Sequence, residues 1–442
     1  MKILFASSEI YPYAKTGGLA DVSSALPIAL KKYSNISRVM PLYGCMNTEK
    51  FAFYDDFSVS LDGNTYSIQV FKDEKKGVCS YFIKAPFLSE TKRLYGDDKG
   101  DYKNNALRFG IFCMAIVQLS LRLNITVIHL NDWHTALVAL FVKDLELGLK
   151  TVFTIHNLAY QGLFDATVLE LLGIPSKYFT MESLEFYEKV NFLKAGIAYS
   201  DIITTVSPTY AKEILTPEFG CGLDGFLRQH QHKLVGILNG IDTISQYNDE
   251  INLINIKAKY KDDTLPLFVM ITRLVAQKGI DLLIDSFSSL MQENINLFIL
   301  GDGDAHITQK LKELAHKYEN FYFFSGYDEK LSHQAYTAAD FLLMPSTFEP
   351  CGLNQFIAMY YGTIPIVHSV GGLQDSVHEK EIKCGRGIGY KNQTKQEFVS
   401  AIKRALALSK QERKKIVAFN RHCDFSFHKS ALKYLKLYKS LV

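Results

Sequence analysis

The sequence lacks the features of a membrane, exported or disulfide-stabilised protein. No uncharged apolar stretch reaches the ~18 residues that a membrane-spanning helix needs, and the apolar run at 3–6 is too short for a signal peptide. The seven cysteines are odd in number and form no CxxC pair, which indicates neither a disulfide framework nor a zinc site. These absences predict a cytoplasmic protein that does not bind membranes.

The chain also lacks an excess of charge of either sign. Its 49 basic and 46 acidic side chains give a formal net charge of +3, so composition gives no reason to expect nucleic-acid binding. Hydrophobic residues make up 48% of the chain, as in ordinary globular proteins. Because 442 residues exceed what one core usually serves, we expect two domains of roughly 200 residues each, with a ligand cleft between them.

Short apolar runs alternate with longer amphipathic stretches in two series, which is typical of parallel sheets wrapped by helices. The first series has runs at 3–7, 126–131, 151–155, 201–206 and 234–238. The second has runs at 267–272, 297–300, 321–324, 341–344 and 364–367, with helical patterns at 280–291, 305–318 and 395–408. An antiparallel hairpin insert is expected at about 57–84, around Asp62-Gly63-Asn64.

These series predict an α/β protein with two doubly wound domains. We place the N-terminal domain at 1–240, a polar linker at 241–262 and the C-terminal domain at 263–426. The segment 427–442 ends the chain with a helical pattern that would fit either domain.

Lys15, Gly17 and Gly18 lie where the first predicted strand passes into a helix. Backbone N–H groups at such a helix start can hold an anion, and Lys15 adds a positive charge. The pattern is neither GxGxxG nor a P-loop, which disfavours nicotinamide binding and nucleotide hydrolysis. A tight turn with a solvated lysine is the alternative interpretation.

The second series has matching cations after its first strand, where Arg273 is followed by Lys278. A guanidinium and an ammonium at a helix start suit a diphosphate leaving group, although two solvated charges in a loop remain an alternative. After the strand ending at Met344, Glu349 can accept hydrogen bonds from sugar hydroxyls or simply favour the helix start that follows. There the N–H groups of Gly352, Leu353 and Asn354 can bind phosphate, while Cys351 is interpreted as a small buried side chain.

Polar residues also end two further strands of the first series. Asp132 and His134 follow one strand, and His156 and Asn157 follow the next. His129 and His134 are five residues apart and lack the HExxH spacing, so no metal site is expected. For each histidine taken alone, a structural hydrogen bond is the simpler interpretation.

Seven motifs together resemble the bacterial glycogen synthase and plant starch synthase family, in family order over residues 1 to about 376. They are Lys15-Thr-Gly-Gly-Leu-Ala-Asp-Val, Asn131-Asp-Trp-His, Thr154-Ile-His-Asn, Ser207-Pro-Thr-Tyr, Asn239-Gly-Ile-Asp, Arg273-Leu-Val-Ala-Gln-Lys-Gly and Phe348-Glu-Pro-Cys-Gly-Leu. The resemblance implies a GT-B glycosyltransferase, with two Rossmann-like domains that face and close across a cleft. It also implies a C-terminal helix returning to the first domain.

The resemblance further implies an enzyme that uses ADP-glucose or UDP-glucose as donor and an α-1,4-glucan such as glycogen as acceptor, with no cofactor. Lys15, the Gly17 and Gly18 backbone, Arg273 and Lys278 would hold the donor diphosphate. His156 would face the glucose and Glu349 its hydroxyls. The remaining substrate-binding positions are Asp21, Asp132, Asn157, Asn239, Cys351, Gly352, Leu353 and Asn354. The family usually has Thr at the position of Asn354.

No carboxylate pair in these motifs is an obvious nucleophile and acid, so we expect retention by front-face substitution and not by double displacement. The cations would stabilise the departing diphosphate. Two other classes stay open at this point. One is a glycoside hydrolase that uses Glu349 with Asp132, and the other is a non-catalytic sugar-nucleotide sensor on the same fold.

Overall fold

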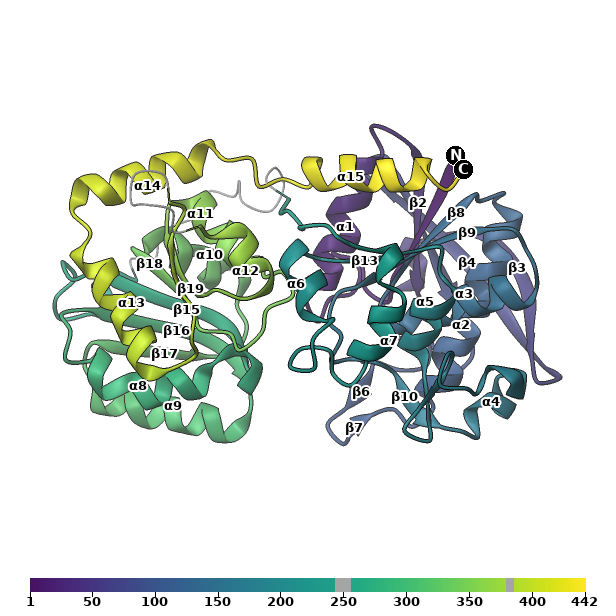
Figure 1. Ribbon diagram of the computed structural model, residues 1–442, viewed down its shortest axis with the longest axis horizontal. Coiled ribbons are helices and arrows are strands. Elements are labelled where there is room, and N and C mark those ends of the chain that lie inside the picture. Colours follow the sequence, from purple (N-terminus) through teal and green to yellow (C-terminus); the bar gives the residue numbers. More distant parts are fainter. Residues whose placement is uncertain (243–255, 379–384) are drawn as a thin grey trace. The chain divides into compact units, whose positions relative to one another are not determined.

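The computed structural model describes residues 1–242, 256–378 and 385–442, and it forms two compact units (Figure 1). The N-terminal unit comprises Met1–Val206, Ala211–Asn239 and Phe427–Val442, and the C-terminal unit comprises Ser207–Tyr210 and Gly240–Ser426. Most of the expected linker at 241–262 lies outside the described residues. In the described parts of the chain, no helix is long and apolar enough to cross a membrane.

A nine-stranded sheet in the order β14-β13-β9-β8-β1-β2-β5-β4-β3 forms the centre of the N-terminal unit. The strands are β1 (Lys2–Ala6), β2 (Asn35–Pro41), β3 (Ala52–Leu61), β4 (Asn64–Lys75), β5 (Val78–Lys84), β8 (Val127–Asn131), β9 (Lys150–Ile155), β13 (Ile202–Thr205) and β14 (Leu234–Gly236). Parallel pairing runs from β14 to β5, and only β5-β4-β3 is antiparallel. The parallel part brings the carboxyl ends of β1, β8, β9, β13 and β14 to one sheet edge.

Strand β2 was not predicted, because the charged Arg38 interrupts its apolar pattern. The structure buries this side chain to 1% exposure, and its Nε donates to Ser80 Oγ of β5 at 3.0 Å. The antiparallel segment is also longer than the hairpin expected at 57–84. It begins at Ala52 and contains β3, β4 and β5, of which β3 and β4 are joined at Leu61–Asn64 by a tight turn in which Asp62 and Gly63 have positive φ.

The helices of the N-terminal unit include α1 (Gly18–Leu30), α2 (Asn105–Arg122), α3 (Trp133–Asp144), α5 (Phe192–Tyr199), α6 (Pro208–Glu213, shared with the other unit), α7 (Asp224–Gln229) and α15 (His428–Lys439). Helix α15 lies beside α1 (Figure 1). Its Ala431, Tyr434 and Tyr438 share a core with Ile3 and Phe5 of β1. The end of the chain therefore completes the core of the N-terminal unit.

A small antiparallel sheet in the order β10-β12-β11 extends from the loop after β9. Its strands are β10 (Leu163–Asp165), β11 (Glu185–Phe186) and β12 (Lys189–Asn191). Strand β12 leads directly into α5, whose N-terminus is capped by Asn191 through a hydrogen bond to the Lys194 N–H. The sheet thus lies on the connection between β9 and β13.

The C-terminal unit contains a fully parallel sheet in the order β17-β16-β15-β18-β19-β20. Its strands are β15 (Leu267–Leu274), β16 (Asn296–Gly303), β17 (Phe321–Ser325), β18 (Phe341–Met344), β19 (Ile364–His368) and β20 (Ile388–Tyr390). The three-residue β20 was not predicted, because it is too short to show a period. Strand β15 runs two residues beyond the predicted end at Thr272, so Arg273 lies within the strand and not after it.

Alternating residues of β15 pack into two separate cores. Phe268 and Met270 face helices α8 (Ile280–Leu290), α9 (Ala305–Lys317) and α13 (Lys395–Ala407). Val269 and Ile271 face α10 (Glu329–Ala338), α11 (Asn354–Tyr361) and α12 (Gly371–Ser376). Figure 1 shows α8 and α9 on one side of this sheet and α10 and α11 on the other. The predicted doubly wound α/β layering is therefore confirmed.

Candidate active site

The start of α1 is occupied by a carboxylate that was not predicted to belong to the site. Glu9, 3% exposed, follows β1 and accepts hydrogen bonds from the backbone N–H groups of Thr16 and Gly17, the latter at 3.2 Å. The Tyr95 hydroxyl donates to the same carboxylate at 2.6 Å. The helix start does attract a negative group, as its backbone dipoles favour, and that group belongs to the chain itself.

Lys15 lies at the same turn and forms an ion pair with Asp21 of α1, with 2.8 Å between Nζ and Oδ1. Both side chains are partly exposed, at 30% and 21%, so solvent screens the pair and leaves it easy to open. A Cβ placed on Gly17 would meet no atom within 4 Å. The turn therefore has open space in front of Gly17 and a partly exposed cation beside it.

Asp132 holds an unusual conformation at the carboxyl end of β8. Its φ is 56° and its ψ is −179°, a combination that L residues rarely adopt and that strained active-site residues do show. Its Oδ1 accepts the His156 N–H at 2.7 Å, and the side chain is 8% exposed. Burial raises the pKa of Asp132 to about 7, although the backbone hydrogen bonds from His156 and Asn157 lower it.

His156 lies next to Asp132 at the end of β9. Its Nε2 is 2.8 Å from Asn131 Oδ1, which can only accept, so Nε2 carries the proton and Nδ1 is an acceptor. Burial lowers the pKa of His156 to about 3. The ring is therefore neutral at physiological pH and can accept a hydrogen bond there. Asn157 forms the turn that follows, where its Oδ1 accepts the Ala159 N–H at 3.0 Å.

The other two histidines of this edge have structural surroundings. His129 is fully buried between Tyr438 of α15 and Thr154 of β9, each 2.6 Å from a ring nitrogen. His134 stacks on Trp133 with 4.0 Å between ring centroids. Asn239, after β14, is 6% exposed, and its Oδ1 has no partner among the described residues. It is a buried acceptor at this edge.

The C-terminal unit brings two predicted residues into direct contact. Lys278 Nζ lies 2.6 Å from Glu349 Oε2, and their side chains are 17% and 7% exposed. Ser346 Oγ donates to the same carboxylate oxygen at 2.9 Å. We expected these two residues to bind different parts of a ligand. The structure shows that each is also the other's partner.

The turn that carries Lys278 requires a glycine after it. Gly279 has a φ of 68°, and a Cβ there would lie 1.8 Å from the Pro345 carbonyl oxygen. This close approach joins the turn after β15 to the loop after β18 and so brings Lys278 beside Glu349. Arg273 lies at the end of β15 with an exposed side chain, so its guanidinium can meet a ligand without breaking a buried contact.

The loop at 349–354 is fixed through its backbone. The Gly372 N–H donates to the Glu349 carbonyl at 3.0 Å, and a Cβ on Gly372 would lie 2.3 Å from Cys351 Cα. Leu353 is the N-cap residue of α11, and Gly352 before it has a φ of 70°. Asn354 Nδ2 donates to the Ile271 carbonyl at 2.6 Å. The Asn354 side chain therefore ties α11 to β15.

Each unit thus presents cations, carboxylates and a helix start at the carboxyl edge of its sheet. Most of these residues were predicted from the sequence, but Glu9, Tyr95, Asn131 and Ser346 were not. For Glu9, the signal was present as an acid three residues past a buried strand and shortly before a helix start. Tyr95 and Ser346 lie in irregular loops, which carry no period.

Two family models match the chain. The model described as starch synthase catalytic domain matches residues 2–229, and the model described as glycosyl transferases group 1 matches residues 253–422. The glycogen synthase of Aquifex aeolicus is 40% identical, over 100% of this chain and 99% of the relative. The glycogen synthase of Thermodesulfovibrio yellowstonii is 38% identical, over 100% of this chain and 98% of the relative.

A solved structure agrees with these matches. The catalytic domain of starch synthase IV from Arabidopsis thaliana, bound to ADP and acarbose, matches with a TM-score of 0.89 and 30% identity over 100% of this chain and 99% of that one. A trehalose-6-phosphate structure from E. coli, bound to UDP-2-fluoro glucose, matches with a TM-score of 0.65 and 13% identity, which supports the GT-B fold alone. The chain is a GT-B hexosyltransferase and belongs to the bacterial glycogen synthase and starch synthase family.

Proposed function

We propose that this chain transfers glucose from ADP-glucose to the non-reducing end of an α-1,4-glucan and retains the anomeric configuration. The observation that carries the proposal is the grouping of Arg273, Lys278 and Glu349 at one sheet edge, beside the start of α11. A diphosphate needs cations and backbone N–H groups, and a sugar needs a buried acceptor. This edge provides all three within one unit.

Arg273 and Lys278 bind the donor diphosphate in this proposal, with the N–H groups at 352–354. When phosphate oxygens are present, the Lys278 ammonium shifts its interaction from Glu349 Oε2 toward them. Glu349 Oε2 can then accept a hydrogen bond from a sugar hydroxyl. Lys15 supplies a further cation for the diphosphate, whereas the Gly17 N–H, predicted to bind the same group, already donates to Glu9. The exchange is favourable because the diphosphate carries more negative charge than a single carboxylate.

Besides Glu349, the contacts to glucose are assigned to groups of the N-terminal unit that are neutral or that have no cationic partner among the described residues. His156, which is uncharged at physiological pH, accepts from a glucose hydroxyl through Nδ1. Asp132, Asn157 and Asn239 supply acceptors at the same edge. Asp21, once released from Lys15, faces the acceptor chain. These assignments rest on burial, on hydrogen bonds and on the family to which the chain belongs.

We propose front-face substitution as the mechanism. The bond from glucose C1 to the diphosphate oxygen breaks while C1 forms a bond to the 4-hydroxyl oxygen of the acceptor. The proton of that hydroxyl passes to the departing diphosphate oxygen, so atoms and charge balance. Arg273 and Lys278 stabilise the negative charge that grows on the leaving group, and this stabilisation is larger in the transition state than in the ground state.

An elongation assay tests the proposal. The protein is incubated with labelled ADP-glucose or UDP-glucose and a maltooligosaccharide, and the products are separated by length. We expect chains extended by single α-1,4-linked glucose units, with ADP-glucose the better donor. Release of free glucose without extension would indicate a hydrolase, and donor binding without turnover would indicate a sensor.

The cytoplasmic location stays a prediction, which localisation of a tagged protein would test.

A further inference from the structure

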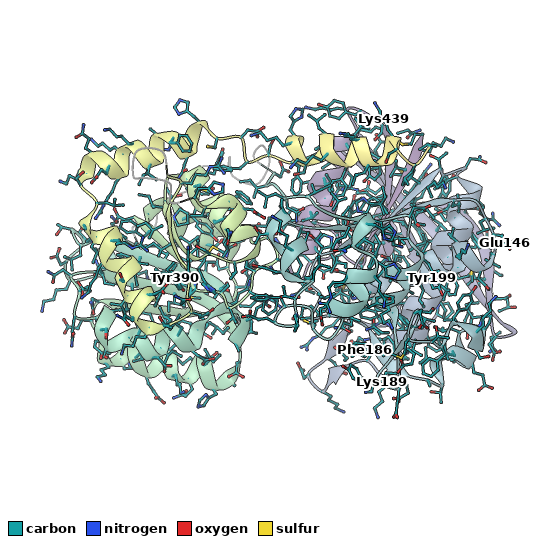
Figure 2. All side chains as sticks on the ribbon, viewed as in Figure 1. Glu146, Phe186, Lys189, Tyr199, Tyr390 and Lys439 are labelled. Carbon is teal, nitrogen blue, oxygen red and sulfur yellow. The ribbon has the colours of Figure 1, made fainter. Side chains whose placement is uncertain are left out.

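The hairpin between β11 and β12 has an unusual turn. Phe186 pairs with Lys189, both labelled in Figure 2, so Tyr187 and Glu188 form a two-residue turn. Both have left-handed backbones, with φ of 49° and 65°. Such turns favour Asn and Gly, because other side chains crowd the backbone there. A tyrosine followed by a glutamate is therefore a poor choice for stability.

Tyr187 gains little from burial in return. Its side chain is 78% exposed, the largest value among the exposed large hydrophobic residues that the structure describes. The ring meets Phe186 edge to face, with 4.7 Å between centroids and an angle of 82°. Gly222 lies against the same pair, and a Cβ there would be 3.0 Å from the Phe186 ring. These contacts orient the Tyr187 ring and leave most of its surface open to solvent.

Buried polar groups anchor the segment that leads into the hairpin. Lys194 of α5 is 3% exposed and donates to the carbonyl oxygen of Met181 at 2.7 Å and to that of Glu185. The hydroxyl of Tyr199, labelled in Figure 2, is 2.6 Å from Ser183 Oγ. An ammonium held by two carbonyls in the interior opposes movement of the segment. The segment that carries Tyr187 is therefore held in place by buried hydrogen bonds.

The hairpin between β11 and β12 is also connected to the loop that follows β9. Gln161 lies five residues after His156 and is 7% exposed. Its Oε1 accepts from Asn191 of β12 at 2.6 Å, and its Nε2 donates to the Cys221 carbonyl at 3.0 Å. The hairpin is therefore held to the polypeptide that carries His156, and it belongs to the connection that leaves the substrate-binding edge of the sheet.

The charged side chains near the turn indicate which class of ligand it can bind. Three carboxylates, of Glu182, Glu185 and Glu188, and one ammonium, of Lys189, lie within five residues of Tyr187. This balance disfavours a polyanion such as nucleic acid or an anionic membrane. It suits a neutral sugar chain, whose C–H face packs on an aromatic ring and whose hydroxyls donate to carboxylates.

We propose that Tyr187 binds a segment of α-glucan chain, apart from the residues assigned to the donor and the reacting hydroxyl. The inference rests on the proposed function, because it takes the glucan acceptor as the ligand. It adds a contact that only a long acceptor can reach. The transferase therefore holds polymer more tightly than it holds short maltooligosaccharides.

Kinetics with two acceptors test this site. For Tyr187→Ala we expect the KM for glycogen to rise about 5- to 20-fold, while kcat with glycogen and all constants with maltotriose stay within twofold. Tyr187→Trp keeps the aromatic face and should keep the wild-type KM. In a native gel that contains glycogen, Tyr187→Ala should be retarded less than wild type. This experiment measures glycogen binding without turnover. Phe53→Ala removes another exposed ring of the same unit, 55% exposed in β3, and should change neither measurement.

An unchanged KM for glycogen in Tyr187→Ala would overturn the inference. So would an equal loss with maltotriose at an unchanged melting temperature, because it would place the residue in the reacting site. A change of oligomeric state in sedimentation, with normal glycogen binding, would instead make the turn an interface between copies and would also overturn it. A wild-type protein that extends neither acceptor would refute the proposed function, a separate result.

Discussion

Lys278 and Glu349 form a nearly buried ion pair, whereas Arg273, nearby in sequence, has an exposed side chain. Within the part of the chain that the structure describes, Lys278→Ala leaves the Glu349 carboxylate with only the Ser346 hydroxyl as side-chain partner. We expect it to lower the free energy of unfolding by on the order of 2–4 kcal/mol, because an unpaired buried charge is costly. Arg273→Ala should change it by less than about 0.5 kcal/mol.

Urea unfolding of both variants measures this difference. The double variant Lys278→Ala, Glu349→Gln removes the unpaired charge and should recover most of the lost stability without recovering transfer. Equal stabilities of Lys278→Ala and wild type would show that the ion pair contributes nothing to the fold.

Asp132 should make the free energy of unfolding fall as pH rises, whereas most carboxylates in folded proteins make it rise. Folding raises its pKa from 3.8 to about 7, so the folded state binds the proton more tightly than the unfolded state does. The contribution of Asp132 to the free energy of unfolding therefore falls as pH rises from about 4 to 7 and is constant above. At pH 8 the carboxylate is ionised in both states and its burial disfavours folding by up to about 4 kcal/mol.

Asp132→Asn removes this cost and can keep the acceptor for the His156 N–H. We expect the variant to melt several degrees above wild type at pH 8 and close to wild type at pH 4, with reduced transfer. Calorimetry across this pH range measures the effect, and parallel profiles for the two proteins would contradict the raised pKa.

Single residues were predictable where a motif placed them at a strand end, and not otherwise. Arg273, Lys278 and Glu349 lie at the ends of recognisable strands or just after them, so their grouping could be expected. Their mutual ion pair could not, because it depends on Gly279 meeting Pro345 across 66 residues of sequence. Glu9 was visible in the sequence, but its bonds to Thr16 and Tyr95 depend on the turn geometry.

At the scale of elements, buried hydrogen bonds between polar side chains hold α15 against the sheet of the N-terminal unit. His129 of β8 contacts Tyr438 of α15 on one side and Thr154 of β9 on the other. Tyr438→Phe leaves a buried ring nitrogen without a partner, so we expect a loss of about 1–3 kcal/mol in the free energy of unfolding. Tyr33→Phe removes an exposed contact with His428 at 3.2 Å and should be neutral.

Chemical denaturation of these two variants compares the buried hydroxyl of Tyr438, on α15, with the exposed hydroxyl of Tyr33, which follows α1 and contacts α15 through His428. A neutral Tyr438→Phe would mean that water or a shifted ring satisfies His129. The amphipathic pattern of 427–442 predicted a helix but left its packing partner open, because apolar spacing does not identify the surface that it meets. His129 supplies that specificity, and it became recognisable only when α15 and β8 were seen together.

For the whole molecule, the alternation of strands and helices was enough to predict the α/β class, because parallel sheets require buried apolar strands and crossover helices. The same rule explains what was missed. Strand β2 contains the buried Arg38, and β20 has three residues. Neither resembles a continuous apolar run.

We also expect transfer without a divalent metal. Arg273, Lys278, Lys15 and the start of α11 supply positive charge of the kind that Mg²⁺ provides in other nucleotide-sugar enzymes. Elongation rates should be unchanged by an excess of chelator. Complete loss of activity in chelator, restored by one specific ion, would contradict this prediction.

The central claim is that Arg273 and Lys278 stabilise the departing diphosphate. The most direct measurement is kcat for Arg273→Ala at saturating ADP-glucose, because this exposed side chain can be removed without cost to the fold. By analogy with the loss of one oxyanion-hole donor, kcat should fall about 10²–10³-fold, on the order of 3–4 kcal/mol, with a smaller loss of donor affinity. A folded Arg273→Ala that elongates glucan at the wild-type rate would contradict the account.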